Sequence, residues 1–218
     1  MRPLFSSFSM ETPSLNLGRN FTAVLRDNIT FRQALLWRKE APNGSPTELT
    51  RAMVLDAVIL KRGEHETMIA PAQYDAMPMP LVVQLTEWLG SVLFQNATPE
   101  KDDPRTLTLP SGLRVRYRTA LVKDQLAAEK WCKNEPQFLI SYLIEQVCTF
   151  WGEEEQAFVQ WAVEDIWDLS VTDGYALMDA VMNEEKSENF FEDFLDGLLP
   201  NSQPDSSGTG SRSRKSKE

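Results

Sequence analysis

The chain has little of what catalysis and metal binding most often use. Its 218 residues include one histidine, His65, and two cysteines, Cys132 and Cys148. The separation of the cysteines fits neither a metal site nor a disulfide framework, so we expect two reduced thiols. The sequence also lacks HExxH, GxSxG, GxGxxG and GKS or GKT strings, which are typical of zinc proteases, serine hydrolases and nucleotide-binding loops. We therefore expect a protein that is not an enzyme and that holds no metal and no cofactor.

Long apolar runs and an excess of basic charge are also missing. No window approaches the roughly 18 apolar residues that cross a bilayer, and residues 1–14 lack the apolar run of a secretory signal. Acidic residues outnumber basic ones by 32 to 22, which gives a net charge of −10. Such a charge argues against a general nucleic-acid binder. We expect a soluble intracellular protein that spans no membrane and binds no specific nucleic acid.

What the chain does have is enough apolar material for a core, with 42% hydrophobic and 10% aromatic residues. Shifts in composition divide it into six segments. These are a flexible N-terminus (1–19), a helical lobe (20–96), a polar linker (97–106), a lobe with a hairpin followed by helices (107–183), an acidic amphipathic helix (184–199) and a disordered tail (200–218).

Helical periodicity dominates both lobes. In SPTELTRAMVLDAVILKRG, Ser45 can cap a helix, Pro46 suits its first turn and Gly63 ends it. QFLISYLIEQVCTFWG and EEEQAFVQWAVEDIW predict two further helices, before and after Gly152. We therefore expect a mainly α fold, built from small helical units that each open with a short β-hairpin or an extended segment.

The two lobes also resemble each other. ITFRQAL (29–35) matches VRYRTAL (115–121), and MVLDAVILKRGE (53–64) has the pattern of YLIEQVCTFWGE (142–153). The similarity indicates two tandem pseudo-repeats. The alternative is chance, because amphipathic helices always share their apolar period.

The stretch LTLPSGLRVRYR (107–118) predicts a β-hairpin, because apolar and polar residues alternate on both sides of a Pro-Ser-Gly turn. One face carries Leu107, Leu109, Leu113, Val115 and Tyr117. The opposite face carries Thr106, Thr108, Arg114, Arg116 and Arg118. The arginine row has two interpretations: a docking face for an acidic partner, or a charged edge that resists unwanted strand pairing.

The hairpin and the residues after it, LPSGLRVRYRTALVKDQLAAE, resemble the opening of small assembly proteins of tailed bacteriophages. The resemblance to the tail assembly chaperone and baseplate hub assembly families covers about 107–182. It rests on Leu109-Pro110-Ser111-Gly112, Tyr117-Arg118, Leu121-Val122-Lys123 and Ala127-Ala128-Glu129.

The resemblance implies a non-enzymatic protein of the host cytoplasm that binds other phage tail or baseplate proteins, the tape-measure protein among them. A structural baseplate component retained in the virion tail is the first alternative. A regulatory interaction module that acts through the helix predicted at 184–199 is the second.

Aromatic residues supply the remaining candidates for partner binding. Trp151, Phe158 and Trp161 are either core residues or anchors of an interface. The acidic segment 184–199 predicts an apolar helical stripe that either packs on its own domain or enters a groove of a partner. Its candidate residues are Phe190, Phe191, Phe194, Leu195 and Leu198.

Overall fold

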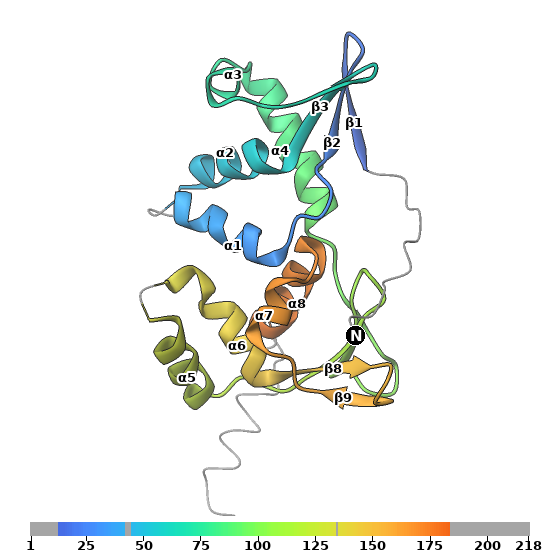
Figure 1. The fold of residues 1–218 in the computed structure, drawn as a ribbon, viewed down its shortest axis with the longest axis vertical. Helices are drawn as coiled ribbons and strands as arrows, with labels where there is room; N and C mark the ends of the chain where they lie inside the picture. Colours follow the sequence, from blue (N-terminus) through green and yellow to red (C-terminus); the bar gives the residue numbers. More distant parts are fainter. Residues whose placement is uncertain (1–12, 42–44, 134, 184–218) are drawn as a thin grey trace, which may run out of the picture. The chain divides into compact units, whose positions relative to one another are not determined.

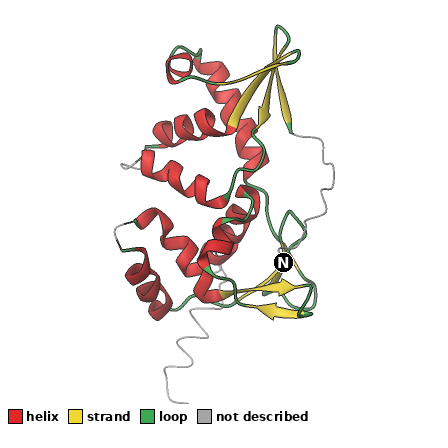
Figure 2. Ribbon diagram, in the orientation of Figure 1, coloured by secondary structure: helices red, strands yellow, loops and turns green. Residues whose placement is uncertain are grey.

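The computed structural model describes residues 13–41, 45–133 and 135–183. Over these residues the chain forms eight α-helices, a short 3-10 helix and two antiparallel sheets of four and five strands (Figure 2). The prediction of a mainly α fold is therefore wrong, and the protein is mixed α/β.

The first half of the chain, residues 14–93, contains the four-stranded sheet, with its strands in sequence order. Its elements are β1 (Ser14–Gly18), β2 (Phe21–Leu25), α1 (Phe31–Glu40), α2 (Pro46–Ala57), β3 (Val58–Arg62), β4 (His65–Met68), α3 (Pro71–Asp75) and α4 (Met79–Leu93).

The second half, residues 98–183, contains the five-stranded sheet, again with its strands in sequence order. Its elements are β5 (Thr98–Pro99), β6 (Thr106–Thr108), β7 (Arg114–Tyr117), α5 (Val122–Cys132), η1 (Pro136–Phe138), α6 (Leu139–Val147), β8 (Cys148–Gly152), β9 (Ala157–Val159), α7 (Val163–Trp167) and α8 (Val171–Asn183).

Apart from β5 and η1, the two halves have the same order of elements: two strands, two helices, two strands and two helices. The register agrees as well. The backbone N–H of Arg26, after β2, donates to Ala57 O at the end of α2 (2.8 Å), and the N–H of Arg118, after β7, donates to Val147 O at the end of α6 (3.0 Å). Below, residues at the same place in matching elements are called equivalent.

Two of the strands that the sequence analysis missed, β3 and β8, follow helices without a break. α2 passes directly into β3 at Val58, and α6 passes directly into β8 at Cys148. No glycine or proline marks either junction, and periodicity alone does not separate a helix from a strand in short apolar segments. The helix predicted over 153–167 is also wrong, because this segment forms a turn, β9 and the short α7.

The predicted hairpin is present as β6 and β7, and its turn is held from two sides. The N–H of Gly112 donates to Leu109 O (2.8 Å), and Gly112 has a φ of 90°, a conformation that glycine adopts at least cost. The N–H of Ser111 donates to Oδ1 of Asp173 in α8 (3.0 Å), a residue that is 3% exposed. The Pro-Ser-Gly turn is thus anchored to the last helix of its own half.

One hydrophobic core includes residues of both predicted lobes. The halves meet chiefly where α1 and α8 lie side by side (Figure 1). In addition, α1 contacts η1 and α7, and α4 contacts α8. The rings of Phe31 and Tyr175 are 6.2 Å apart in an edge-to-face arrangement. The segment predicted as a linker, 97–106, carries β5 and the first residue of β6.

Candidate functional site

The outer face of the second sheet gathers four of the six predicted candidate residues that the structure describes. Strand register places them on the side opposite the buried residues Leu107, Val115 and Phe150. We use "the outer face" for this set: Thr106, Thr108, Arg114, Arg116, Thr149, Trp151 and Phe158.

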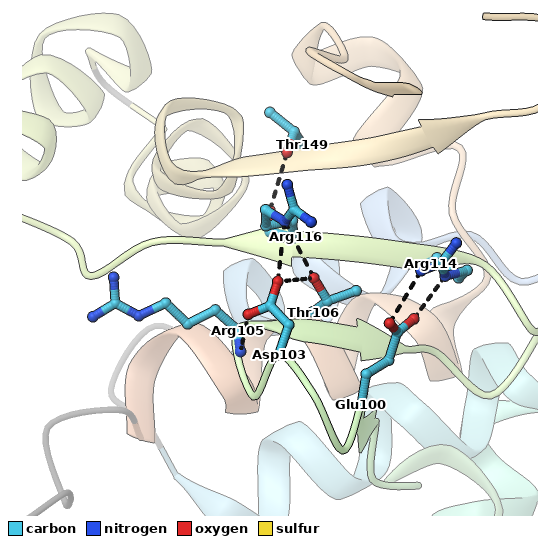
Figure 3. Close-up of polar contacts among 7 residues, drawn as sticks. All are labelled: Glu100, Asp103, Arg105, Thr106, Arg114, Arg116 and Thr149. Atoms are coloured by element: carbon cyan, nitrogen blue, oxygen red, sulfur yellow. Dashed lines mark hydrogen bonds and ion pairs between the residues drawn. The ribbon is translucent and has the colours of Figure 1, made fainter. Parts of the chain in front are cut away.

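Arg114 makes a two-pronged ion pair on this face. Its Nε and Nη2 donate to Oε1 and Oε2 of Glu100 at 2.6 and 3.0 Å, as Figure 3 shows. The hydrogen bond from Arg114 lowers the pKa of Glu100. Two parallel bonds of this kind fix the orientation of both groups.

The guanidinium of Arg116 has two polar partners, and its backbone oxygen accepts from the hydroxyl of Thr149 (3.4 Å; Figure 3). Its Nε lies 3.3 Å from Oδ2 of Asp103 and donates to the hydroxyl of Thr106 (3.2 Å). That hydroxyl donates in turn to Oδ2 of Asp103 (2.7 Å). The pKa of Asp103 is lowered, first by the bond from Thr106 and further by the charge of Arg116.

The two arginines also cover two aromatic rings. The rings of Trp151 and Phe158, on neighbouring strands, are 5.3 Å apart and nearly perpendicular. The guanidinium carbon of Arg114 is 5.0 Å from the Trp151 ring centre, and that of Arg116 is 4.3 Å from the Phe158 ring centre. These distances are within the range of cation–π attraction.

Each arginine of the outer face therefore meets a carboxylate on one side and an aromatic ring on the other. The positive charges are balanced locally, so the face does not offer a row of free cations to an acidic partner. Arg116 remains 52% exposed, and aromatic and arginine side chains are the types most often found at the centres of protein interfaces. These side chains therefore suit a site that binds the surface of another protein.

Arg118 and Trp161, also predicted as candidates, lie elsewhere. Arg118 binds both carboxylate oxygens of Asp124 (2.7 and 3.0 Å) and the backbone oxygen of Gln146 (2.9 Å). This pairing lowers the pKa of Asp124. Trp161 stacks on the buried ring of Phe150 at 4.2 Å, on the core side of the sheet. Both residues therefore stabilise the fold rather than contribute to the outer face.

Sequence reasoning missed the two carboxylates that complete the outer face. Glu100 and Asp103 lie in the segment predicted as a linker, ATPEKDDPRT. The available signal was a cluster of acids shortly before a strand with arginines at alternate positions. The other predicted candidates, Phe190, Phe191, Phe194, Leu195 and Leu198, lie outside the described residues.

The first sheet shows what the fold itself requires at these positions. Lys61 and Glu66, which pair across β3 and β4, are equivalent to Trp151 and Phe158. In the first half the two form an ion pair. The aromatic pair and its arginines are therefore particular to the second half and are not a demand of the shared architecture.

Over the residues that the structure describes, no helix is long and apolar enough to cross a membrane. Within the same residues, no group of three or more histidine, cysteine, aspartate or glutamate side chains could hold a metal ion. Compared with known proteins, the chain matches no family model, no curated protein and no solved structure.

Proposed function

We propose that this chain is a non-enzymatic assembly factor of a tailed bacteriophage, and that it binds another tail or baseplate protein through the outer face. The resemblance of about residues 107–182 to tail assembly proteins supports the choice of partner class. The arginines and the aromatic residues of the outer face lie within this range.

One observation carries the proposal. Two equivalent sheets share an architecture, yet only one of them has two aromatic rings under arginine side chains where the other has Lys61 and Glu66. Since the first sheet folds without such a cluster, its presence in the second sheet needs a reason other than folding. Burial of aromatic anchors against a partner is the commonest such reason.

Binding measurements with purified proteins test the proposal. The partners are the tube, tape-measure and baseplate proteins encoded by the same virus, each tested separately against the full chain by interferometry. Trp151→Ser with Phe158→Ser should weaken binding to one of them by about thirtyfold, which corresponds to about 2 kcal/mol. Circular dichroism checks that the variant still folds.

The matched control is Lys61→Ser with Glu66→Ser, at the equivalent positions of the first sheet. It should leave the affinity unchanged. Binding to none of the tail proteins would refute the function. An equal loss in both double variants would leave the function in place but remove the outer face as its site.

A further inference from the structure

The contact between α1 and α8 joins the two halves through two apolar stripes. On α1 the stripe is the first helical residue and the one a turn later, Phe31 and Leu35, each 0% exposed. On α8 it is again the first residue and the one a turn later, Val171 and Tyr175, at 3% and 5%. Phe31 meets Tyr175 edge to face.

Each stripe has an equivalent in the other half, and no described residue covers either equivalent. On α5, which is equivalent to α1, the first residue and the one a turn later are Val122 and Leu126, 75% and 59% exposed. On α4, which is equivalent to α8, they are Met79 and Val83, 70% and 48% exposed. The molecule thus uses this interface once and leaves one copy of each side unpaired.

We propose that the two exposed stripes bind each other between two copies of the chain, with α5 of one copy on α4 of the next, as α1 packs on α8 within one copy. The occupant of each exposed stripe is therefore a second copy of this protein. The proposal does not rest on the binding of tail proteins.

Side-chain sizes fit such a pairing. In the internal contact a large residue faces a small one: a Cβ added at Gly174 would lie 2.2 Å from ring atoms of Phe31. The equivalents of these two residues are Val82 and Val122. Two residues of middle size thus replace a large and a small one, which keeps the combined volume similar, and volume-conserving exchanges are the ones that packing tolerates.

Backbone groups fit it as well. In the internal contact the N–H of Phe31 donates to Leu169 O (2.8 Å), and the N–H of Val171 donates to Ile29 O (3.0 Å). The equivalent donors are the N–H groups of Val122 and Met79, for which the described residues offer no hydrogen-bond partner. First-turn N–H groups need a partner from outside their own helix, and a second copy supplies one through the backbone oxygens equivalent to those of Leu169 and Ile29.

The charges at the edge of the proposed contact are also opposite in sign. Arg32, next to Phe31 on α1, lies over the ring of Trp167, the last residue of α7, at 4.7 Å. Their equivalents are Lys123 on α5 and Asp75, the last residue of α3, whose carboxylate also binds Arg51 of its own copy (3.0 and 3.3 Å). The pairing between copies would thus replace a cation over a ring by two opposite charges.

Because α4 and α5 are different surfaces, the proposed contact is head-to-tail. A pair formed in this way still presents one free α4, on one copy, and one free α5, on the other, so association continues until a ring closes or the supply of protein ends. A symmetric dimer, in which α5 meets α5 or α4 meets α4, would behave differently, and this difference can be measured.

Two end-blocked variants of the full chain test the proposal by light scattering after size exclusion, across a dilution series. Val122→Glu with Leu126→Glu blocks the α5 end, and Met79→Glu with Val83→Glu blocks the α4 end. We expect the wild type to exceed the mass of a dimer at high concentration and each variant alone to stay at the 24.8 kDa of one chain. Mixed together, the two variants should form a dimer and nothing larger, because only one productive pair of ends remains.

The control is Leu36→Glu with Met68→Glu, which changes two other exposed apolar residues, 37% and 39% exposed, and should assemble like the wild type. Thermal melting confirms that the variants fold, and Val122→Ser with Leu126→Ser replaces the glutamate variant if that one does not. A wild type that stays monomeric throughout would overturn the proposal. So would a blocked variant that dimerises alone, or a mixture that remains monomeric.

Discussion

The two halves of this chain share an architecture and differ in what covers it. α1 is packed between its own half and α8, whereas α5 packs on α6 and η1 of its own half. The outer side of the first sheet pairs Lys61 with Glu66, and the second pairs Trp151 with Phe158 under two arginines. Positions where the halves agree report on folding, and positions where they differ are where function is to be sought.

The largest expected effect comes from enlarging Gly174, against which the ring of Phe31 packs where the halves meet. Gly174→Ala places a methyl group 2.2 Å from ring atoms of Phe31, a residue with no exposed surface. The ring or the backbone must shift, so we expect a loss of about 3 kcal/mol in the free energy of unfolding. Urea denaturation measures it.

Gly90→Ala is the matched control, because Gly90 lies in α4, the helix equivalent to α8, and nothing lies within 4 Å of an added Cβ. Alanine there should stabilise the protein by about 0.5–1 kcal/mol through its higher helix propensity. A small effect at Gly174 would mean that the α1–α8 contact is looser than the distances indicate. The assembly interface inferred from that contact would then lose its template.

The next effect concerns the arginine that follows the second strand of each half. Arg118 pairs with Asp124, which also accepts the N–H of Leu121 (2.9 Å) and whose side chain is 7% exposed. Arg26 pairs with Asp56, 36% exposed. Asp124→Asn should cost about 2 kcal/mol, and Asp56→Asn should cost less, because solvent screens the more exposed pair.

The cost of Asp124→Asn should depend on pH. The folded protein holds the pKa of Asp124 below its ordinary value, chiefly through the bonds from Arg118. Its stabilisation is therefore complete above the unfolded pKa of about 4 and is lost as the pH falls through the lower folded value. Denaturation curves of wild type and variant should converge in acid. A difference that persists below that range would show that packing, rather than charge, is responsible.

The sequence predicted local features with strong chemical signals and missed those that depend on context. The hairpin predicted at 107–118 and the helix predicted to begin after Ser45 are both present. The strands β3 and β8 were missed because they continue apolar helices with no glycine or proline between. A segment of that kind becomes a strand through pairing with a distant partner, β2 or β7, and a local pattern does not contain that information.

The candidate site shows the same limit. Alternation placed Arg114 and Arg116 on one face of the hairpin, opposite the buried Val115. It did not show that β8 and β9 would bring Trp151 and Phe158 beneath them, because helices were predicted over 137–152 and 153–167, where these strands lie. The match of ITFRQAL with VRYRTAL is also out of register, since the first begins α1 and the second spans β7 and the loop before α5.

The smallest effect tests how differently the two opening hairpins turn. The first-half turn places three successive residues at positive φ, Gly18, Arg19 and Asn20, whereas the second uses Gly112 alone, at 90°. Gly112→Ala should therefore cost about 1 kcal/mol in the free energy of unfolding, measured in urea, because a Cβ disfavours that conformation.

Ser111→Ala in the same turn keeps the backbone N–H that binds Asp173 and loses only a weak acceptor for the N–H of Leu113, at 3.4 Å. It should change stability by less than about 0.5 kcal/mol. An equal loss in the free energy of unfolding for Gly112→Ala and Ser111→Ala would mean that the serine hydroxyl, rather than the backbone conformation, stabilises this turn. The Leu-Pro-Ser-Gly turn would then depend on its serine side chain for stability. Its geometry indicates instead that it depends on Gly112 and on the buried carboxylate of Asp173.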